Sequence, residues 1–243
     1  MNAITQAILN KSKLEIELIK ITNATHSSFV MSLKGKATKI GVATAIISEM
    51  TVDLVGPQGA FGRLNVPSIK MGSLGATITI VDQLINIIDM GAFQAFVAAI
   101  MKEEDLTLRL ENGHATVKAM GMKSIIVYHK VLHLKGLKSL QSTLVKEEVG
   151  TDGVRSSTIS LMNPSQFEVD LGTVVYEVQD KNGKRIGEQK GATYVPRGAS
   201  SLALCGAVTG EVLGGETRFV GVDVEEENWI KQIMRSIEVV VTV

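Results

Sequence analysis

The dominant pattern along the chain is alternation of apolar and polar residues with a period of two. It is clearest at residues 14–18, 77–81, 106–110 and 174–178, and residues 238–243 are nearly all β-branched. Such alternation is typical of β-strands with one buried face, and β-branched residues favour strands. Turn residues separate these runs, so we predict a mostly β fold.

Two dipeptides and one glycine-rich segment predict turns between strands. Asn112-Gly113 and Asn182-Gly183 favour two-residue hairpin turns, because both residue types tolerate positive φ. Residues 56–62 superficially resemble a phosphate-binding loop, but such a loop must open a helix whose free N–H groups point at the anion. The residues that follow do not favour a long helix, so we predict a hairpin loop here as well.

Two segments show the period of an amphipathic helix instead. In residues 91–104 and 223–237, apolar residues recur at spacings of three and four, which places them on one helical face. Asp223 followed by Glu226 predicts an N-cap with a capping-box acid at the start of the second helix. The apolar residues are Phe93, Phe96, Val97, Ile100 and Met101 in the first segment, and Trp229, Ile230, Ile233, Met234 and Ile237 in the second.

The two predicted helices occupy similar places in two similar halves of the chain. Each half has an alternating strand, an Asn-x-Thr or Asn-x-Ser segment (at Asn23 or Asn163), further strands, a glycine turn, a proline, a strand and the helix. This shared order indicates an internal duplication. A polar, turn-rich stretch at residues 147–153 predicts the boundary, so we expect two domains, residues 1–146 and 147–243.

Composition limits the classes of function. Hydrophobic residues make up 45% and charged residues 21%, which is typical of a folded globular chain. A single cysteine excludes an intramolecular disulfide framework and a thiolate zinc cage. The 25 cations equal the 25 carboxylates, and aromatic residues are only 4%. We therefore expect no nucleic-acid partner, which would need excess cations or stacking aromatics.

The charge is nevertheless uneven along the chain. Residues 1–146 hold 16 Lys and Arg against 10 Asp and Glu, whereas residues 147–243 hold 9 against 15. Oppositely charged halves favour either attraction between the two domains or head-to-tail stacking of copies.

Neither a membrane span nor a secretory signal is predicted. The most apolar stretch, residues 75–101, is interrupted by Asp82 and Asp89, and residues 1–10 carry no early cation. We expect the chain as given to be soluble and cytoplasmic.

The order of motifs resembles a known family. The first half contains Leu14-x-Ile-x-Leu followed by Asn23-Ala-Thr, and the second contains Ile159-x-Leu-x-Asn163-Pro-Ser165 followed by Leu-Gly172-x-Val. This is similar to the signature of late-embryogenesis-abundant type-two domains, also called water-stress and hypersensitive-response domains. The chain is most similar to the fungal branch of that clan, which is a domain of unknown function. Ala24 stands where the signature has proline, which weakens the expected turn.

The resemblance implies two tandem immunoglobulin-like or fibronectin-like β-sandwiches, each with one amphipathic α-helix. Many fungal relatives carry an N-terminal membrane anchor, which we expect this chain to lack. Other relatives are vacuolar and lysosomal membrane proteins, for which lipid binding in an apolar groove has been suggested. Plant relatives are linked to desiccation and stress.

Candidate reactive residues are few. His129 and His133 lie in a run that predicts a strand, along which four residues span about 13 Å, too far for two ligands of one zinc ion. Cys205 lies in an apolar run, so we predict a buried, unreactive thiol. We therefore expect no catalytic, metal-binding or cofactor-binding residue and no enzyme activity.

The predicted function is a non-catalytic binding module that holds a lipid or another apolar ligand in a groove beside the sandwich. Candidate groove walls are Phe93, Phe96, Ile100, Trp229 and Ile233. The same apolar stripes equally fit two ordinary hydrophobic cores.

The densest basic segment of the chain is a candidate contact for lipid headgroups. It contains Lys34, Lys36 and Lys39, and its alternative interpretation is a solvated turn. A second hypothesis is a structural or stress-protective protein that acts by self-association. Two features favour this hypothesis. The two halves carry opposite charge, and the β-branched C-terminal segment would form an edge strand that can pair with a strand of another copy.

Overall fold

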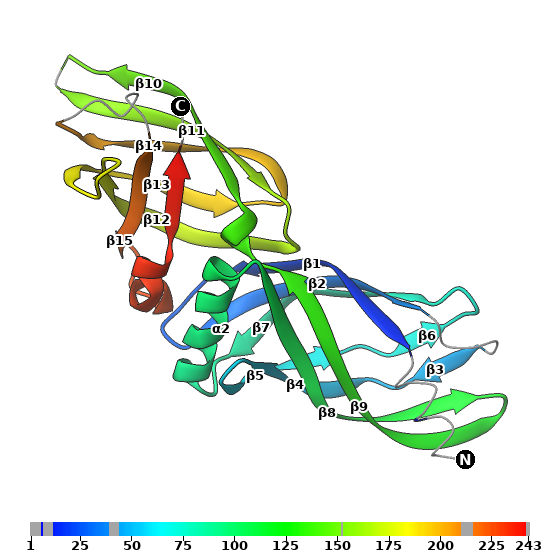
Figure 1. The fold of residues 1–243 in the computed structure, drawn as a ribbon. Coiled ribbons are helices and arrows are strands. Elements are labelled where there is room, and N and C mark those ends of the chain that lie inside the picture. Colours follow the sequence, from blue (N-terminus) through cyan, green and yellow to red (C-terminus); the bar gives the residue numbers. More distant parts are fainter. Residues whose placement is uncertain (1–5, 7–11, 39–43, 152, 210–215, 242–243) are drawn as a thin grey trace. The chain divides into compact units, whose positions relative to one another are not determined.

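Alternation of apolar and polar residues produces a mostly β chain, as predicted (Figure 1). The computed structural model describes residues 6, 12–38, 44–151, 153–209 and 216–241. Contacts divide the chain into two compact units. Unit 1 comprises residues 1–20, 28–96 and 105–134, and unit 2 comprises residues 21–27, 97–104 and 135–243.

The strands of unit 1 fall into two sheets, an arrangement consistent with a β-sandwich. One sheet has the order β1-β2-β7, and the other has the order β5-β4-β8-β3-β6 with β9 also paired to β8. The strands are β1 (Lys13–Thr22), β2 (Ser28–Thr38), β3 (Ala45–Ile47), β4 (Met50–Gly56), β5 (Gly59–Val66), β6 (Ile69–Met71), β7 (Ala76–Asn86), β8 (Asp105–Ala119) and β9 (Met122–Lys135).

The core of unit 1 follows from the period of the strands. In β9 every second side chain is buried, so that Ile126 and Leu132 face inward while Ile125 and Val131 face solvent. The helix α2 (Met90–Lys102) confirms the first predicted helix, and Asp89 Oδ1 accepts a hydrogen bond from the Ala92 N–H near its start. The predicted hairpin loop at residues 56–62 is also confirmed, because β4 and β5 pair across it.

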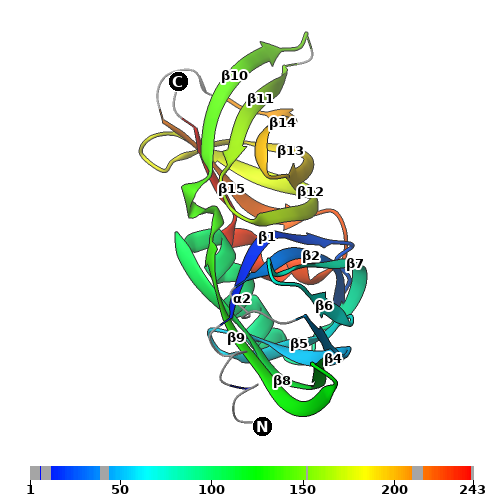
Figure 2. The ribbon, with the colours of Figure 1, turned by 90° about the vertical axis from the view of Figure 1, so that its right-hand side faces the viewer.

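The predicted hairpin turn at Asn112-Gly113 is wrong, because β8 runs straight through it. Asn112 has the expected positive φ of 58°, but its Nδ2 donates to Asp53 Oδ2 at 2.8 Å. A Cβ on Gly113 would lie 2.8 Å from Val52 Cγ1, so glycine is needed here for close packing within the sandwich. The turn that joins β8 to β9 (Figure 2) lies instead at Met120 and Gly121, both with positive φ.

The strands of unit 2 pair in the order β10-β11-β14-β13-β12, and β12 also pairs with β15, which pairs with β16. The Ser142 hydroxyl of β10 donates to the Val240 carbonyl of β16 at 2.5 Å, which brings the first and last strands together. The elements are η1 (Leu137–Ser139), β10 (Gln141–Val149), β11 (Val154–Asn163), β12 (Phe167–Gln179), β13 (Arg185–Val195), β14 (Gly198–Ala207), β15 (Thr217–Val224), η2 (Trp229–Ser236) and β16 (Glu238–Val241).

The polar stretch at residues 147–153, predicted as a domain boundary, lies at the hairpin between β10 and β11. Both strands belong to unit 2, and the last change of unit along the chain falls between Leu134 and Lys135. A hairpin forms at Asn182-Gly183, since β12 pairs with β13 across it. The predicted two-residue turn is wrong, because the loop spans residues 180–184, where the Asp180 carboxylate accepts the backbone N–H groups of Asn182 and Lys184.

The second predicted helix forms only in part, and it is a 3₁₀-helix. Strand β15 continues to Val224, so Asp223 is not its N-cap. The cap is Asn228, whose Oδ1 accepts from the Ile230 N–H at 2.8 Å. Glu226 does not close a capping box, because its carboxylate accepts the backbone N–H of Thr173 at 3.0 Å.

Among the helices of the described ranges, none is long and apolar enough to cross a membrane.

Candidate binding groove

A surface groove lies in unit 1 beside the strands β4, β5 and β7. Its cavity volume is about 570 Å³, which falls within the usual range for small-molecule sites. The residues that line it come from these strands and the segments next to them: Glu49, Met50, Thr51, Asn65, Val66, Pro67, Thr79, Ile80 and Val81.

The groove arises because two edge strands meet at one end and separate towards the other. Among the described strands, β5 pairs only with β4, and β7 pairs only with β2. They approach where the Ile88 N–H donates to the Phe61 carbonyl at 3.0 Å. Gly62 of β5 also packs tightly against β7 at this end, since a Cβ on Gly62 would lie 2.8 Å from Ile85 Cγ2. The groove-lining residues Asn65 and Thr79 lie further along these strands, where the two edges leave a gap.

The surface that lines the groove is about equally polar and apolar, and the buried side chains among its lining residues are apolar. Met50, Val66 and Ile80 are buried, whereas the side chain of Val81 is 69% exposed. A β-bulge in β7 next to Val81 brings Asp82 to a positive φ of 47°. Ser32 Oγ holds this bulge, because it donates to Asp82 Oδ1 and accepts from the Asp82 N–H, each at 2.9 Å. Val81 lies on the outward face of β7 by strand alternation, on the same side as Thr79.

The polar groups of the groove lie on β4 and β5. Thr51 Oγ1 donates to Asn65 Oδ1 at 2.8 Å, which fixes the orientation of the Asn65 amide. In the described part of the chain, the Asn65 Nδ2 group has no hydrogen-bond partner, so it can donate to a ligand. Glu49 is the one ionisable side chain among the nine lining residues. The site therefore offers apolar contact and a few hydrogen bonds.

A smaller cavity of about 40 Å³ lies inside unit 2, beneath β16. Leucine and valine side chains line most of it, together with Tyr176 and Thr193, whose hydroxyls are 3.1 Å apart. Burial raises the pKa of Tyr176 to about 12, and the hydrogen bond with Thr193 opposes this shift. The cavity exceeds the roughly 10–15 Å³ that one water needs but is far below the volume of a ligand site.

The five residues predicted as groove walls are all buried. Phe93 stacks on Phe29 with ring centroids 4.9 Å apart, and Phe61 contacts both Phe93 and Phe96 at 5.6 and 4.7 Å. In unit 2, Trp229, Ile230, Ile233 and Met234 are the buried face of η2. Neither of the two cavities above is lined by Phe93, Phe96, Ile100, Trp229 or Ile233. Their role as walls stays a prediction.

The basic segment is a strand and not a turn. Lys34 and Lys36 are exposed on β2, and Lys34 Nζ is 3.0 Å from the Glu17 carboxylate. Lys39 lies outside the described residues. The C-terminal strand β16 is paired with β15 on one side, and its Val240 carbonyl accepts from Ser142.

The structure agrees with the prediction for the two candidate histidines and contradicts the prediction for the cysteine. His129 and His133 are exposed on β9, as predicted. Cys205 is exposed, so the predicted buried thiol is wrong. The reason is the register of β14: Leu202 and Leu204 face inward, so Cys205 faces outward, directly opposite Lys190 of β13. Within the described ranges, no group of three His, Cys, Asp or Glu side chains could hold a metal ion.

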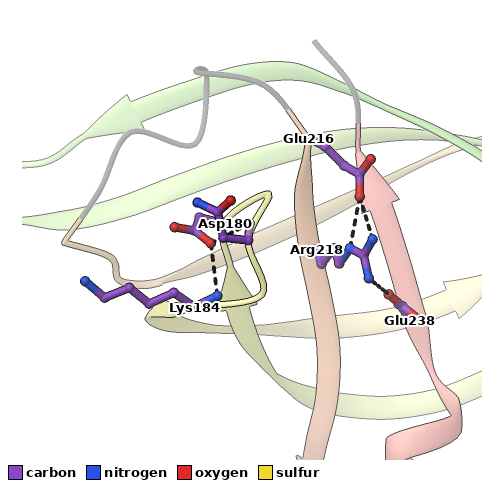
Figure 3. A network of polar contacts seen from close by, with 6 residues as sticks. Asp180, Lys184, Glu216, Arg218 and Glu238 are labelled. Atoms are coloured by element: carbon purple, nitrogen blue, oxygen red, sulfur yellow. Dashed lines mark hydrogen bonds and ion pairs between the residues drawn. The ribbon is translucent and has the colours of Figure 1, made fainter.

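Two groups of polar contacts at the surface of unit 2 have a structural explanation (Figure 3). Arg218 donates to Glu216 at 2.8 Å and lies 3.7 Å from Glu238, which raises the pKa of Arg218. The N–H group of Lys184, followed by that of Asn182, lowers the pKa of Asp180. These groups join neighbouring strands or close a turn at the surface, where ion pairs contribute little stability.

No local sequence pattern predicts the groove. Alternation at residues 77–81 correctly predicted strand β7. The groove beside Thr79 is flanked by a β-bulge at Asp82 and by the edge strand β5, which lies earlier in the chain. Neither can be read from a local pattern.

Part of the chain is similar to a known protein family. Residues 59–178 match a family described as protein of unknown function (DUF3712). No curated protein matches the chain.

The chain also has weak similarities to solved structures. With the exo-chitosanase CsxA of Amycolatopsis orientalis it shares 14% identity at a TM-score of 0.29, over 93% of this chain and 26% of that chain. With red sea bream transglutaminase it shares 13% identity at a TM-score of 0.24, over 94% of this chain and 31% of that one. With the calcium-binding domain CBD12 of CALX1.1 it shares 10% identity at a TM-score of 0.19, over 95% and 100% of the two chains. The chain thus spans about a quarter of the chitosanase. Similarities at these scores carry no argument about function.

Proposed function

We propose that the chain is a non-catalytic binding module that holds a lipid or another elongated apolar ligand in the groove between β5 and β7. The observation that carries this proposal is a groove of about 570 Å³ whose buried lining side chains are apolar. Ligand pockets are typically apolar with a few placed polar groups. Met50, Val66 and Ile80 supply the apolar surface here, and the Asn65 amide supplies a donor.

Two neighbouring threonines of β7 provide a matched test. Thr77 and Thr79 are both exposed, and each lies opposite a lysine of β2, Lys36 and Lys34 respectively. Only Thr79 lines the groove. Thr79→Glu and Thr77→Glu therefore add the same charge opposite a lysine, although Lys34 is also paired with Glu17, and only Thr79→Glu brings a carboxylate into the groove.

We expect spin-labelled stearic acid, titrated against the full chain, to bind the Thr77→Glu variant as it binds the unmodified protein. Thr79→Glu should weaken its affinity at least tenfold, because burying a carboxylate beside the acyl chain costs more than about 1.4 kcal/mol. Electron paramagnetic resonance measures bound and free probe directly. Equal affinity of both variants, or no binding by the unmodified chain, would contradict the proposed groove.

We also propose that the chain belongs to the late-embryogenesis-abundant type-two clan and contains two tandem copies. The matched family over residues 59–178 supports a domain of unknown function. The Asn163-Pro-Ser165 segment supports the motif assignment, because Asn163 and Ser165 form a buried, hydrogen-bonded turn between β11 and β12. The segment at Asn23 differs, since it joins β1 and β2, which are neighbours in one sheet.

A further inference from the structure

Three strands of unit 1 end together, and this end has an unusual surface. Strand β3 pairs with both β6 and β8, so Ile46 lies directly between Lys70 and Lys118. Beyond these three neighbouring residues, β8 continues into the turn at Met120 and Gly121, and β6 continues into the turn between Gly72 and Gly75. Both turns therefore project from the same end of the sheet, near the labels β3 and β6 in Figure 1.

Large apolar side chains are exposed on these turns. Leu74 is 90% exposed and Met120 is 80% exposed, the highest values among the large hydrophobic residues that the structure describes. Met122 and Ile46 beside them are 46% and 42% exposed. Single exposed apolar residues are ordinary on a protein surface. Here four exposed apolar residues lie at one end of one sheet, two of them at the tips of turns, and we call this group the apolar tip.

Lysines surround the apolar tip, and carboxylates are missing from its segments. Lys70, Lys118 and Lys123 are exposed, and none forms an ion pair with a described residue. Residues 44–48, 68–78 and 115–125 contain no Asp or Glu. Nine other cations described in the chain form ion pairs with a carboxylate, as Lys34 does with Glu17. The tip therefore combines apolar side chains with uncompensated positive charge.

We propose that the apolar tip docks on an anionic lipid bilayer, with Leu74 and Met120 inserted among the acyl chains and the lysines among the headgroups. Amphipathic surfaces with apolar residues and lysines bind membrane interfaces in this way. Protruding apolar turns suit a fluid bilayer, which adapts to their shape. A site for free phosphate would need the lysines but would gain nothing from Leu74 or Met120. The inference goes beyond the groove, because the two surfaces share no residue.

The expected contributions can be stated as fold-changes in the partition coefficient. Each lysine at an anionic surface contributes about fivefold, so three contribute about 100-fold. Burial of one leucine or methionine side chain contributes roughly tenfold or more. Binding should also weaken as salt screens the lysines.

Flotation with vesicles of phosphatidylcholine containing 30% phosphatidylserine tests the proposal on the full chain. We expect binding at 0.1 M salt, much weaker binding at 0.5 M salt, and little binding to pure phosphatidylcholine. Lys70→Gln/Lys118→Gln/Lys123→Gln should lose about 100-fold, and Leu74→Ser/Met120→Ser, which removes two inserted side chains, should lose about 100-fold or more.

Matched variants in unit 2 control for charge and for apolarity. Lys138→Gln/Lys181→Gln/Lys184→Gln removes the same charge from exposed positions, and Val145→Ser/Val149→Ser removes two apolar side chains that are 65% and 62% exposed. Both controls should bind vesicles as the unmodified chain does. Thr79→Glu should also bind vesicles as the unmodified chain does. This result would distinguish failure of the proposed ligand groove from failure of the proposed membrane contact.

Three results would overturn the proposal. The first is absence of binding to the anionic vesicles. The second is an equal loss in the tip and control variants. The third is full competition by inorganic phosphate together with undiminished binding of Leu74→Ser/Met120→Ser, which would identify an anion site without membrane insertion.

Discussion

Phe93→Ala is expected to lower the free energy of unfolding by about 3–5 kcal/mol, the usual cost of truncating a buried phenylalanine. Phe93 is fully buried, its ring stacks on Phe29 with an interplanar angle of 13°, and it also contacts Phe61. Loss of the ring leaves a cavity where β2, β5 and α2 converge. Urea unfolding followed by circular dichroism measures the change.

Two variants define how this result is to be interpreted. Phe93→Leu refills most of the volume and should cost much less than Phe93→Ala. Ile88→Ala changes a side chain that is 54% exposed in the same unit, and its effect should stay within about 0.5 kcal/mol. If Phe93→Ala were as stable as the unmodified chain but bound the stearate probe more weakly, Phe93 would be a groove wall, which is the other hypothesis that its sequence pattern allows.

Asn163→Ala should destabilise the chain by about 2–4 kcal/mol, because one buried side chain satisfies four polar groups. Its Nδ2 donates to the carbonyls of Phe167 and Pro196 at 2.8 and 3.0 Å. Its Oδ1 accepts from the backbone N–H and the hydroxyl of Ser165 at 2.9 and 2.7 Å. Alanine leaves these groups without their partner in a site where Asn163 is only 2% exposed.

The neighbouring Met162 supplies the control for this prediction. Its side chain is 45% exposed, so Met162→Ala should change the free energy of unfolding by less than about 0.5 kcal/mol. Ser165→Ala should fall between the two, since it removes the hydroxyl that accepts from the Phe167 N–H and donates to Asn163. Thermal unfolding ranks the three variants. A stable Asn163→Ala would show that the turn between β11 and β12 does not need the amide.

The strands and the first helix could be predicted because local periodicity decides them. Side chains in β7, β8 and β9 alternate between buried and exposed as the sequence indicates. The helix α2 follows from the spacing of Phe93, Phe96 and Ile100. In these elements burial of one face dominates, and that face can be read from a few consecutive residues.

The errors occurred where tertiary contacts override local preference. Asn112-Gly113 has the residues of a hairpin turn, but glycine is needed there to let Val52 and Tyr128 pack closely. The actual turn at Met120 contains a residue type with no turn preference, and strand register sets its position. The start of the second helix was misplaced because Glu226 bonds to the Thr173 N–H, a partner far away in sequence. The groove likewise depends on edge strands that meet only in the fold.

Photo-crosslinking of the full chain would locate a ligand bound in the groove between β5 and β7. The full chain would be irradiated with a stearic acid that carries a diazirine in its acyl chain, and the labelled residues would be mapped by mass spectrometry. We expect labels on groove residues such as Met50, Val66 and Val81, and we expect unlabelled stearic acid to suppress this labelling. Labels confined to other surfaces, or labelling that stearic acid does not suppress, would contradict the proposed groove.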